Sequence, residues 1–326
     1  MSSVKIVGLM IEAGFLVIDK PAGLTSQRVV GKIKQLMRCR KVGHTGTLDP
    51  LATGVLPIAL NRATRLIQYL DEDTKIYSGE IELGIESDTL DRDGEVIARY
   101  SGSLDFDKEQ IEAVLLRYLG QITQTAPIYS AIKSKGRPLY AYARAGVEVK
   151  PPERRIRIDE FTLLSYKAPL IAFRVVCSKG TYVRSLAADV GRDLGCGGRI
   201  WSLRREASGR FNLEQAISFE VLSDMILSGE EPPLLSSLEV LDHLPRLVLL
   251  DAGLQNRVAH GMVLPRSEWP ESWSEHLTGI RAETEIMLLD EADNLLALAR
   301  LSGCGNNDSV DCGLRMSRVM KAAGSD

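Results

Sequence analysis

The chain has 326 residues, of which 44% are hydrophobic and 25% are charged, with a formal net charge of −3, so it is long and apolar enough to form two domains with substantial cores. No apolar run approaches the roughly 18 residues of a transmembrane helix, and residues 1–14 lack the pattern of a signal peptide, so we expect a cytoplasmic protein without membrane association. The five cysteines are scattered without a Cys-x-x-Cys pair, and no glycine-rich phosphate loop occurs, which argues against structural zinc and nucleotide sites.

The net charge hides an uneven distribution along the chain. Between residues 20 and 65 a single acid, Asp49, stands among the bases Lys20, Arg28, Lys32, Lys34, Arg38, Arg40, Lys41, Arg62 and Arg65. A second basic stretch runs from Lys133 to Arg157, whereas acids dominate from Glu214 to Asp311. This asymmetry predicts that the first two-thirds of the chain binds a polyanion such as nucleic acid. The acidic part is predicted to be solvent-exposed surface.

The first predicted element is a short strand over Phe15–Ile18 that ends before Pro21. Ser26 then caps a predicted helix whose apolar residues recur at helical spacing, namely Val29, Val30, Ile33, Leu36 and Met37. The basic residues on the other faces of this helix serve either as solvent cover or as nucleic-acid contacts, and the sequence leaves both readings open.

The segment Lys41–Val55 combines several glycines with Pro50, His44 and the lone carboxylate of Asp49. Glycine permits backbone shapes that other residues avoid, while Pro50 restricts Asp49 to an extended conformation. Such a loop would present one acidic side chain in a fixed direction within a basic surface. The alternative is a structural Asp49 that stabilises the turn before Ala52.

After this loop, residues 63–70 have the pattern of a helix, and residues 75–87 alternate with the period of a strand. Tyr77 lies on the apolar face of that strand, so it is either a core residue or part of the edge of a cleft. Asp107 is the predicted N-cap of an amphipathic helix, and the pattern predicts that this helix ends at Gly120.

A long connection over residues 127–150 mixes lysine and arginine with Tyr129, Tyr140 and Tyr142, a composition suited to unstacked RNA bases and phosphates. Beyond it, residues 155–166 and 170–177 have the pattern of two pairing strands.

Gly180 next leads into a helix with Arg184 in its first turn. An arginine gains nothing from the helix dipole at that position. Arg184 therefore predicts a nearby carboxylate partner.

The succession of strands with a few interspersed helices predicts an α+β fold, with a mixed, largely antiparallel sheet flanked by helices. We expect a large domain over residues 1–245, which includes an RNA-binding basic connection at about 127–157. A small β-rich module over residues 246–301 and a flexible tail over residues 302–326 follow.

Four segments carry the most distinctive residues: Gly43–Leu60 with the preceding Asp19–Ser26, Ala126–Lys133, Cys177–Ser185, and Leu203–Arg205. In their order and spacing they resemble the bacterial TruB family of tRNA pseudouridine synthases, over most of the first 215 residues. The resemblance implies a pseudouridine-synthase catalytic domain and a PUA-like C-terminal module. It also implies an isomerase that converts uridine 55 in the T-loop of tRNA to pseudouridine. Asn61–Arg62 departs from the Gly–Glu that is usual after the first segment, which puts local RNA contacts in doubt.

The resemblance implies a catalytic trio of Asp49, Tyr77 and Arg184. Asp49 matches the reactive carboxylate, Arg184 its partner, and Tyr77 the tyrosine that stacks on the uracil. Further positions are implied to bind substrate: Lys20, His44, Lys179, Tyr182 and Leu203.

Four of these further positions have an implied task. Leu203 would close the pocket on the base, and His44 would fill the space left by the flipped nucleotide, unless it only bonds within its own loop. Lys20 and Lys179 would support either phosphate binding or the fold of the active site.

Pseudouridylation breaks the N1–C1′ bond of uridine and rejoins the base through C5 without net redox change, so we expect no cofactor and no metal. The expected partner is tRNA, bound by a monomer. Two other classes remain open, namely a non-catalytic RNA-binding or tRNA-folding protein and a guide-RNA-dependent synthase. A carboxylate in a basic cleft favours the enzyme, and the long basic connection favours direct recognition of tRNA.

Overall fold

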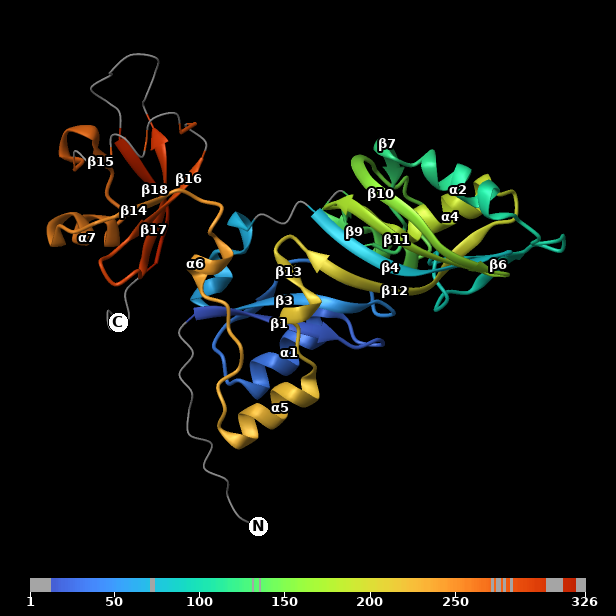
Figure 1. The fold of residues 1–326 in the computed structure, drawn as a ribbon, viewed down its shortest axis with the longest axis horizontal. Coiled ribbons are helices and arrows are strands. Elements are labelled where there is room, and N and C mark those ends of the chain that lie inside the picture. The colour runs from blue at the N-terminus through green and yellow to red at the C-terminus, as the bar shows by residue number, and fades with distance from the viewer. Residues whose placement is uncertain are drawn as a thin grey trace, which may run out of the picture.

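A computed structural model of the chain describes residues 13–70, 74–130, 132–134, 136–270, 273, 277, 280, 281, 284–302 and 313–320. Within these residues a nine-stranded sheet forms the larger part and a five-stranded sheet the C-terminal part. Figure 1 shows the two parts joined through a segment that contains the short helix α6 (Ser237–Val240). No helix of the described residues is long and apolar enough to cross a bilayer.

The large sheet has the order β1-β3-β12-β4-β11-β10-β7, with β2 beside β3 and β13 beside β12. Its strands are β1 (Ala13–Lys20), β2 (Val42–His44), β3 (Thr53–Asn61), β4 (Thr74–Leu83), β7 (Gly120–Thr125), β10 (Glu153–Lys167), β11 (Leu170–Ser178), β12 (Gly198–Ser208) and β13 (Phe211–Asn212). Neighbouring strands are antiparallel except β3 and β12, which are parallel. The predicted α+β fold with a mixed, largely antiparallel sheet is therefore confirmed.

Alternating side chains give this sheet its buried face. In β11 the buried positions are every second residue, Ile171, Phe173, Val175 and Cys177, as the strand period requires. Helices α2 (Lys108–Leu116) and α4 (Val183–Asp193) cover this face and complete one hydrophobic core. A capping box of Asp107 and Gln110 begins α2, which ends at Leu116 rather than at the predicted Gly120.

The predicted first helix is present as α1 (Ser26–Leu36), but its cap lies one residue earlier than expected. The side chain of Thr25 accepts the hydrogen bond from the backbone N–H of Arg28 at 3.1 Å. The hydroxyl of Ser26 is instead bonded to the backbone of Leu48, which lies in the loop before β3. The cap prediction was wrong because a tertiary contact occupies the serine.

The helix predicted over residues 63–70 is also wrong. The chain forms two short 3₁₀ turns, η1 (Arg62–Arg65) and η2 (Ile67–Tyr69). A 3₁₀ turn has three residues per turn, so it places Ala63 and Leu66 on one side, where both are fully buried.

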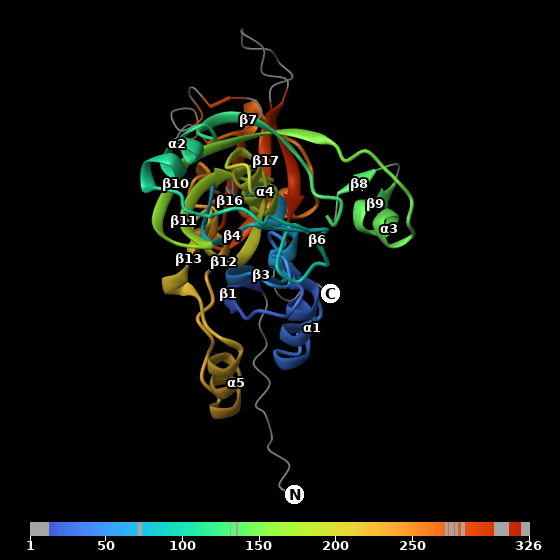
Figure 2. The same ribbon diagram turned by 90° about the vertical axis from the view of Figure 1, so that its right-hand side faces the viewer.

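The basic connection forms a small hairpin of β8 (Lys133–Ser134) and β9 (Arg137–Pro138), followed by α3 (Leu139–Arg144). Figure 2 shows these elements standing beside the sheet. The guanidinium of Arg137 lies 5.2 Å from the ring centre of Tyr142, a cation–π contact. Ala131, Lys135 and the side chains of Lys133, Tyr140 and Arg144 lie outside the described part.

The remaining elements of the large part connect these layers. They are the hairpin β5 (Ile85–Ser87) and β6 (Val96–Arg99), the turn η3 (Leu213–Gln215) and the helix α5 (Phe219–Ser228). Residues 88–95 join β5 to β6. Helix α5 lies beside α1 (Figure 1), where Lys32 contacts the ring of Phe219.

The C-terminal part is the predicted small β-rich module. Its sheet has the order β14-β16-β17-β18-β15. The elements are β14 (Arg246–Val248), α7 (Ala252–Ala259), β15 (Leu264–Pro265), η4 (Arg266–Glu268), β16 (Glu285–Leu289), β17 (Leu295–Ser302) and β18 (Gly313–Val319).

The prediction of a flexible tail over residues 302–326 is wrong for Gly313–Val319. This segment is the strand β18, which pairs with both β17 and β15, and Leu314 is fully buried. Its backbone hydrogen bonds come from strands that are distant in sequence, so its local pattern does not reveal it. Residues 303–312 and 321–326 lie outside the described residues.

The two parts share a hydrophobic cluster. Met287, Leu289, Leu298 and Met320 of the C-terminal module pack in one cluster with residues of the large part that include Phe15, Val17, Val55, Phe211 and Leu241. The module therefore covers apolar side chains of β1 and β3.

Candidate active site

A cavity of about 310 Å³ lies where the loop before β3, strands β4 and β12, and the turn before α4 meet. The predicted site residues that line it are Asp49, Tyr77, Lys179, Tyr182, Arg184 and Leu203. They come from segments far apart in sequence, so the fold brings together what the sequence separates.

The loop that carries Asp49 is held on both sides of the carboxylate. On one side, the backbone N–H of Leu48 donates to the hydroxyl of Ser26 at 2.8 Å. On the other, the carbonyl of Pro50 accepts from the ammonium of Lys20 at 3.1 Å and from the backbone of Gly23 at 2.8 Å. Asp49 itself is half-buried, so its side chain is fixed at the cavity without being sealed from it.

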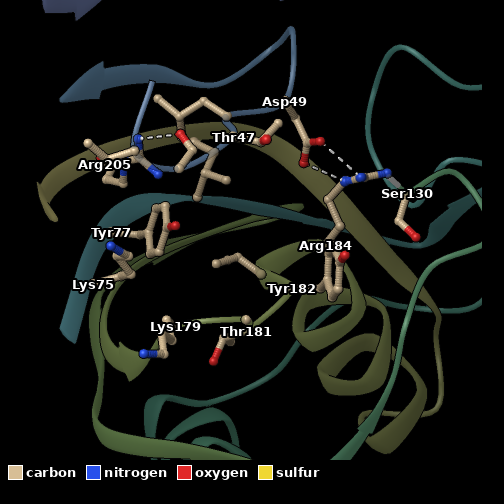
Figure 3. A pocket seen from close by; sticks show the side chains of 16 residues that line it. Thr47, Asp49, Lys75, Tyr77, Ser130, Lys179, Thr181, Tyr182, Arg184 and Arg205 are labelled. Carbon is tan, nitrogen blue, oxygen red and sulfur yellow. Dashed lines mark hydrogen bonds and ion pairs between the residues drawn. The ribbon is translucent and has the colours of Figure 1, made fainter. Parts of the chain in front are cut away.

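Arg184 of α4 binds this carboxylate with a fork of two hydrogen bonds. Its Nε donates to Oδ2 of Asp49 at 2.7 Å, and its Nη2 donates to Oδ1 at 3.0 Å. The same guanidinium donates to the carbonyls of Thr89 and Tyr129 at 2.8 and 3.0 Å, so its orientation is fixed from several elements. Figure 3 shows Asp49 and Arg184 facing each other, with the two bonds drawn. The sequence prediction that Arg184 has a carboxylate partner agrees with this geometry.

A second carboxylate, Asp91, lies behind Arg184, with Oδ2 3.7 Å from Nη1. It accepts hydrogen bonds from the hydroxyl of Thr89 and the backbone of Asp93. Burial raises the pKa of Asp91, and these hydrogen bonds and the charge of Arg184 oppose the rise. Arg184 is therefore placed between two carboxylates, of which only Asp49 lines the cavity.

The opposite side of the cavity is formed by β4 and β12, which pair so that Arg205 lies across from Tyr77 (Figure 3). Burial raises the pKa of the Tyr77 phenol above its ordinary value, so it is a neutral hydroxyl at neutral pH. Two residues before it, the buried Lys75 also lines the cavity and donates to the hydroxyl of Ser208 at 2.7 Å.

Gly54 explains how β12 comes close enough to β3 to place Arg205. Its φ of 97° is in the left-handed region, and a Cβ there would lie 2.2 Å from the carbonyl oxygen of Arg205. Only glycine adopts this φ readily and also lacks the Cβ that would clash with this oxygen.

Tyr182 is held in the turn before α4 by a buried glutamine. Gln124 of β7 accepts from the backbone N–H of Tyr182 at 2.8 Å and donates to its carbonyl at 3.0 Å. The guanidinium of Arg154 lies 5.4 Å from the centre of its ring. This arrangement gives an aromatic ring with a neighbouring cation at the wall of the cavity.

Lys20 and His44 do not line the cavity within the described residues. Lys20 is fully buried and donates to the carbonyls of Pro21 and Pro50, so it supports the Asp49 loop. Burial lowers the pKa of Lys20 to about 8, although the charge of Asp49 opposes this shift. His44 ends β2, one residue before Thr45, which does line the cavity.

No functional role was predicted for Lys75, Asp91 or Arg205, although Lys75 and Arg205 line the cavity and Asp91 lies beside Arg184. Strand alternation could have found two of them, because residues two apart in a strand share a face. Lys75 shares its face with Tyr77, and Arg205 shares its face with Leu203. No sequence signal marks Asp91, whose proximity to Arg184 depends on the turn between β5 and β6.

Asn61, the departure noted above, has a structural task. Its side-chain oxygen accepts from the backbone N–H groups of Arg40 and Lys41 at 2.9 and 3.2 Å, and its own φ is 48°. Asparagine tolerates a positive φ better than most residues. It therefore fixes the backbone of an exposed basic segment.

The arrangement provides an oriented carboxylate, a buried phenol and a cavity with several cations around it. Within the described residues, no group of three His, Cys, Asp or Glu side chains is placed to hold a metal ion. These groups suit chemistry in which a positioned carboxylate acts on a bound substrate that carries negative charge nearby.

Comparison with known proteins identifies matching family models and similar chains. Residues 34–183 match the model of the TruB family pseudouridylate synthase N-terminal domain, and residues 184–246 match that of the tRNA pseudouridylate synthase B C-terminal domain. A tRNA pseudouridine synthase B from Geobacter sulfurreducens is 41% identical over 94% of this chain and 99% of its own. One from Bacillus subtilis is 40% identical over 87% of this chain and 92% of its own.

A solved structure of a Cbf5-Nop10-Gar1 complex contains a similar chain. The two folds superpose with a TM-score of 0.69 at 26% identity, over 94% of this chain and 85% of the other. The chain of an H/ACA RNP bound to a substrate RNA containing 2′-deoxyuridine has a TM-score of 0.68 at 25% identity, over 94% of this chain and 84% of the other.

Proposed function

Since the chain belongs to the TruB family of pseudouridylate synthases and is a tRNA pseudouridine synthase, we propose that it isomerises the uridine at position 55 in the T-loop of tRNA. The observation that carries this proposal is the Asp49–Arg184 fork at a nucleotide-sized cavity. In the reaction, the N1–C1′ bond breaks, the C5–C1′ bond forms, C5 loses a proton and N1 gains one. Atoms and electrons balance without a redox partner.

The cavity requires the uridine to leave the loop and enter the protein. Flipping a base costs a few kcal/mol, and stacking on an aromatic side chain returns roughly 1–3 kcal/mol. Tyr77 and Tyr182 supply the aromatic rings in the lining, so we assign them to the base. Leu203 lies beside them on β12 and closes the pocket on the uracil.

Asp49 acts on the ribose of the flipped nucleotide. Arg184 keeps its carboxylate ionised and aimed, because a guanidinium fork stabilises the anion and fixes its orientation. Lys179 lies in the lining and Lys20 beneath the loop, so we assign Lys179 to the substrate phosphates and Lys20 to the support of the loop. His44 is assigned to the space that the flipped nucleotide leaves in the RNA.

We further propose that the protein acts as a monomer on tRNA alone, with the C-terminal module as a PUA-like RNA-binding part. The chain is more similar to the tRNA pseudouridine synthases than to the proteins of the H/ACA particle, which supports an enzyme that needs no guide RNA.

The test uses a tRNA transcript labelled with tritium at C5 of its uridines. Wild-type protein without guide RNA should release tritium, because C5 loses its hydrogen only when the C5–C1′ bond forms. Asp49→Asn should release essentially none while still binding tRNA, since the amide keeps the shape and loses the charge. Asp19→Asn is the matched control, because Asp19 pairs with Arg204 and does not line the cavity.

A transcript with cytidine at position 55 tests the target. Release should disappear with this substrate. If wild-type protein releases no tritium from several unmodified transcripts, a non-catalytic RNA-binding protein is favoured. Release only with an added guide RNA would favour a guide-RNA-dependent synthase. Release that persists with cytidine 55 would place the target uridine elsewhere in the tRNA.

A further inference from the structure

Arg205 is a buried cation that the catalytic roles above do not use. Its side chain is 1% exposed, yet it contributes to the lining of the cavity. Its Nε donates to the carbonyl of Val55 at 2.7 Å, and its Nη2 donates to the carbonyl of Gly46 at 3.2 Å. Among the residues that the structure describes, no carboxylate forms an ion pair with it. Because these acceptors are neutral, no neighbouring carboxylate among the described residues compensates the positive charge of the guanidinium.

The neighbour across the strands is Tyr77. Arg205 and Tyr77 pair in register between β12 and β4, and side chains directly opposite on one face have Cβ atoms about 5 Å apart. Figure 3 shows the guanidinium and the phenol ring adjacent to each other, away from the Asp49–Arg184 pair.

The ionisable groups around Tyr77 act in opposite directions. Burial raises its pKa most, and the charges of Asp49 on the loop and of Cys177 on β11 raise it further. Arg205 on β12 lowers it, through its charge and a side-chain hydrogen bond. Lys75 precedes Tyr77 by two residues on the same face of β4, so a further cation lies nearby. Arg205 is therefore the main group that opposes the effect of burial.

We propose that Arg205 is a positioning residue for Tyr77, whose buried guanidinium orients the phenol in the cavity and stabilises its ionised form. The carbonyls of Val55 and Gly46 fix the guanidinium, so its charge is present before substrate arrives. Tyr77 is a neutral phenol in the resting protein, and the guanidinium lowers the free-energy cost of forming the phenolate, which is the form able to accept a proton from bound uridine. The inference rests on the proposed function, in which Tyr77 contacts the uridine.

The experiment reads Tyr77 directly and needs no substrate. The full chain carries 3,5-difluorotyrosine at position 77, because fluorine withdraws electrons and brings the ionisation of the phenol into a pH range where the protein stays folded. Its ¹⁹F NMR shift is followed against pH in the wild-type background and in Arg205→Gln, Arg205→Lys and Arg204→Gln. Arg204 is the matched control, since it is the neighbouring arginine of the same strand and pairs with Asp19 instead.

Arg205→Gln should raise the titration midpoint by about one pH unit or more, the usual effect of losing a nearby opposite charge. Arg205→Lys keeps the charge but loses the planar fork, so its midpoint should rise by less. Arg204→Gln should titrate with the wild type. If Arg205→Gln does not fold, Arg205→Lys alone tests the proposal, because the proposal also requires a higher titration midpoint in that variant.

A midpoint in Arg205→Gln or Arg205→Lys that coincides with the wild type would overturn the inference, as would an equal shift in Arg204→Gln. The pH dependence of turnover is a second measurement. Arg205→Lys should lose activity at neutral pH and recover part of it as pH rises. Because the titration is measured without RNA, a failure of the proposed function leaves its outcome unaffected.

Discussion

Asp49 and Arg184 are joined by two hydrogen bonds, of 2.7 and 3.0 Å, across 135 residues of sequence. The arginine is 4% exposed and the carboxylate 32%, so the pair is sealed on the protein side and open on the cavity side. This asymmetry lets one partner serve as a fixed support while the other meets substrate.

Arg184→Met should lower the free energy of unfolding and the turnover number together. Removing one partner of a buried pair costs roughly 3–5 kcal/mol, and the open side of Asp49 places the expected loss near the lower end. Turnover at saturating tRNA should fall by about a hundredfold or more, since about 2.7 kcal/mol corresponds to that factor. Urea unfolding and single-turnover assays measure the two effects. Arg184→Lys, which keeps the charge without the fork, should recover part of the stability; wild-type turnover in both variants would exclude the pair from the reaction.

Lys20 should make stability depend on pH. Its pKa is about 8 in the folded protein and 10.5 in the unfolded chain, so between these values the unfolded state binds one more proton. Stability therefore rises with pH through this window and is lower by on the order of 3 kcal/mol below it. The measurement is the difference in unfolding free energy between wild type and Lys20→Met from pH 7 to pH 11. A difference that stays constant, or that falls as pH rises, would contradict the lowered pKa.

Arg40 and Lys41 should contribute to RNA affinity through charge. Both are exposed, and Asn61 fixes their backbone beside the loop of Asp49. The double change to Glu should weaken tRNA binding and reduce the slope of log affinity against log salt by about one to two units. Lys108 and Arg117, exposed on and after α2 at the other end of the large sheet (Figure 1), form the matched control. Equal slopes for the two double variants would remove this segment from the RNA interface.

The cluster shared by the two parts should couple their stabilities. Met287 and Ile286 are consecutive, fully buried residues of β16, but Met287 belongs to the shared cluster and Ile286 to the core of the module. Either change to Ala should cost about 2–5 kcal/mol. Only Met287→Ala should also speed amide hydrogen exchange in β1 and β3, which carry the other half of the cluster. Unchanged exchange there, in a variant that is otherwise destabilised, would mean that the module folds separately.

The sequence alone located most of the elements that depend on local periodicity, although the helix predicted over residues 63–70 is two 3₁₀ turns. Strand alternation located β4 and the face that carries Tyr77, and helical spacing located α1, α2 and α4. The position of Arg184 in a first helical turn predicted its carboxylate partner, because the helix dipole does not stabilise an arginine at that position. The order of four motifs predicted the family, and the resemblance named six of the residues that line the cavity but also Lys20 and His44, which do not.

Tertiary structure decided the features that depend on contacts between distant segments. Lys20 is a support beneath the loop because burial leaves it only backbone carbonyls to bind, and no local pattern distinguishes that lysine from an exposed one. Gly313–Val319 is a strand because β17 and β15 supply its hydrogen bonds. Arg205 carries an uncompensated charge beside Tyr77 because two strands pair in one particular register. Charge and hydrogen bonding act through space, so residues of the same type acquire different roles only when the chain has folded.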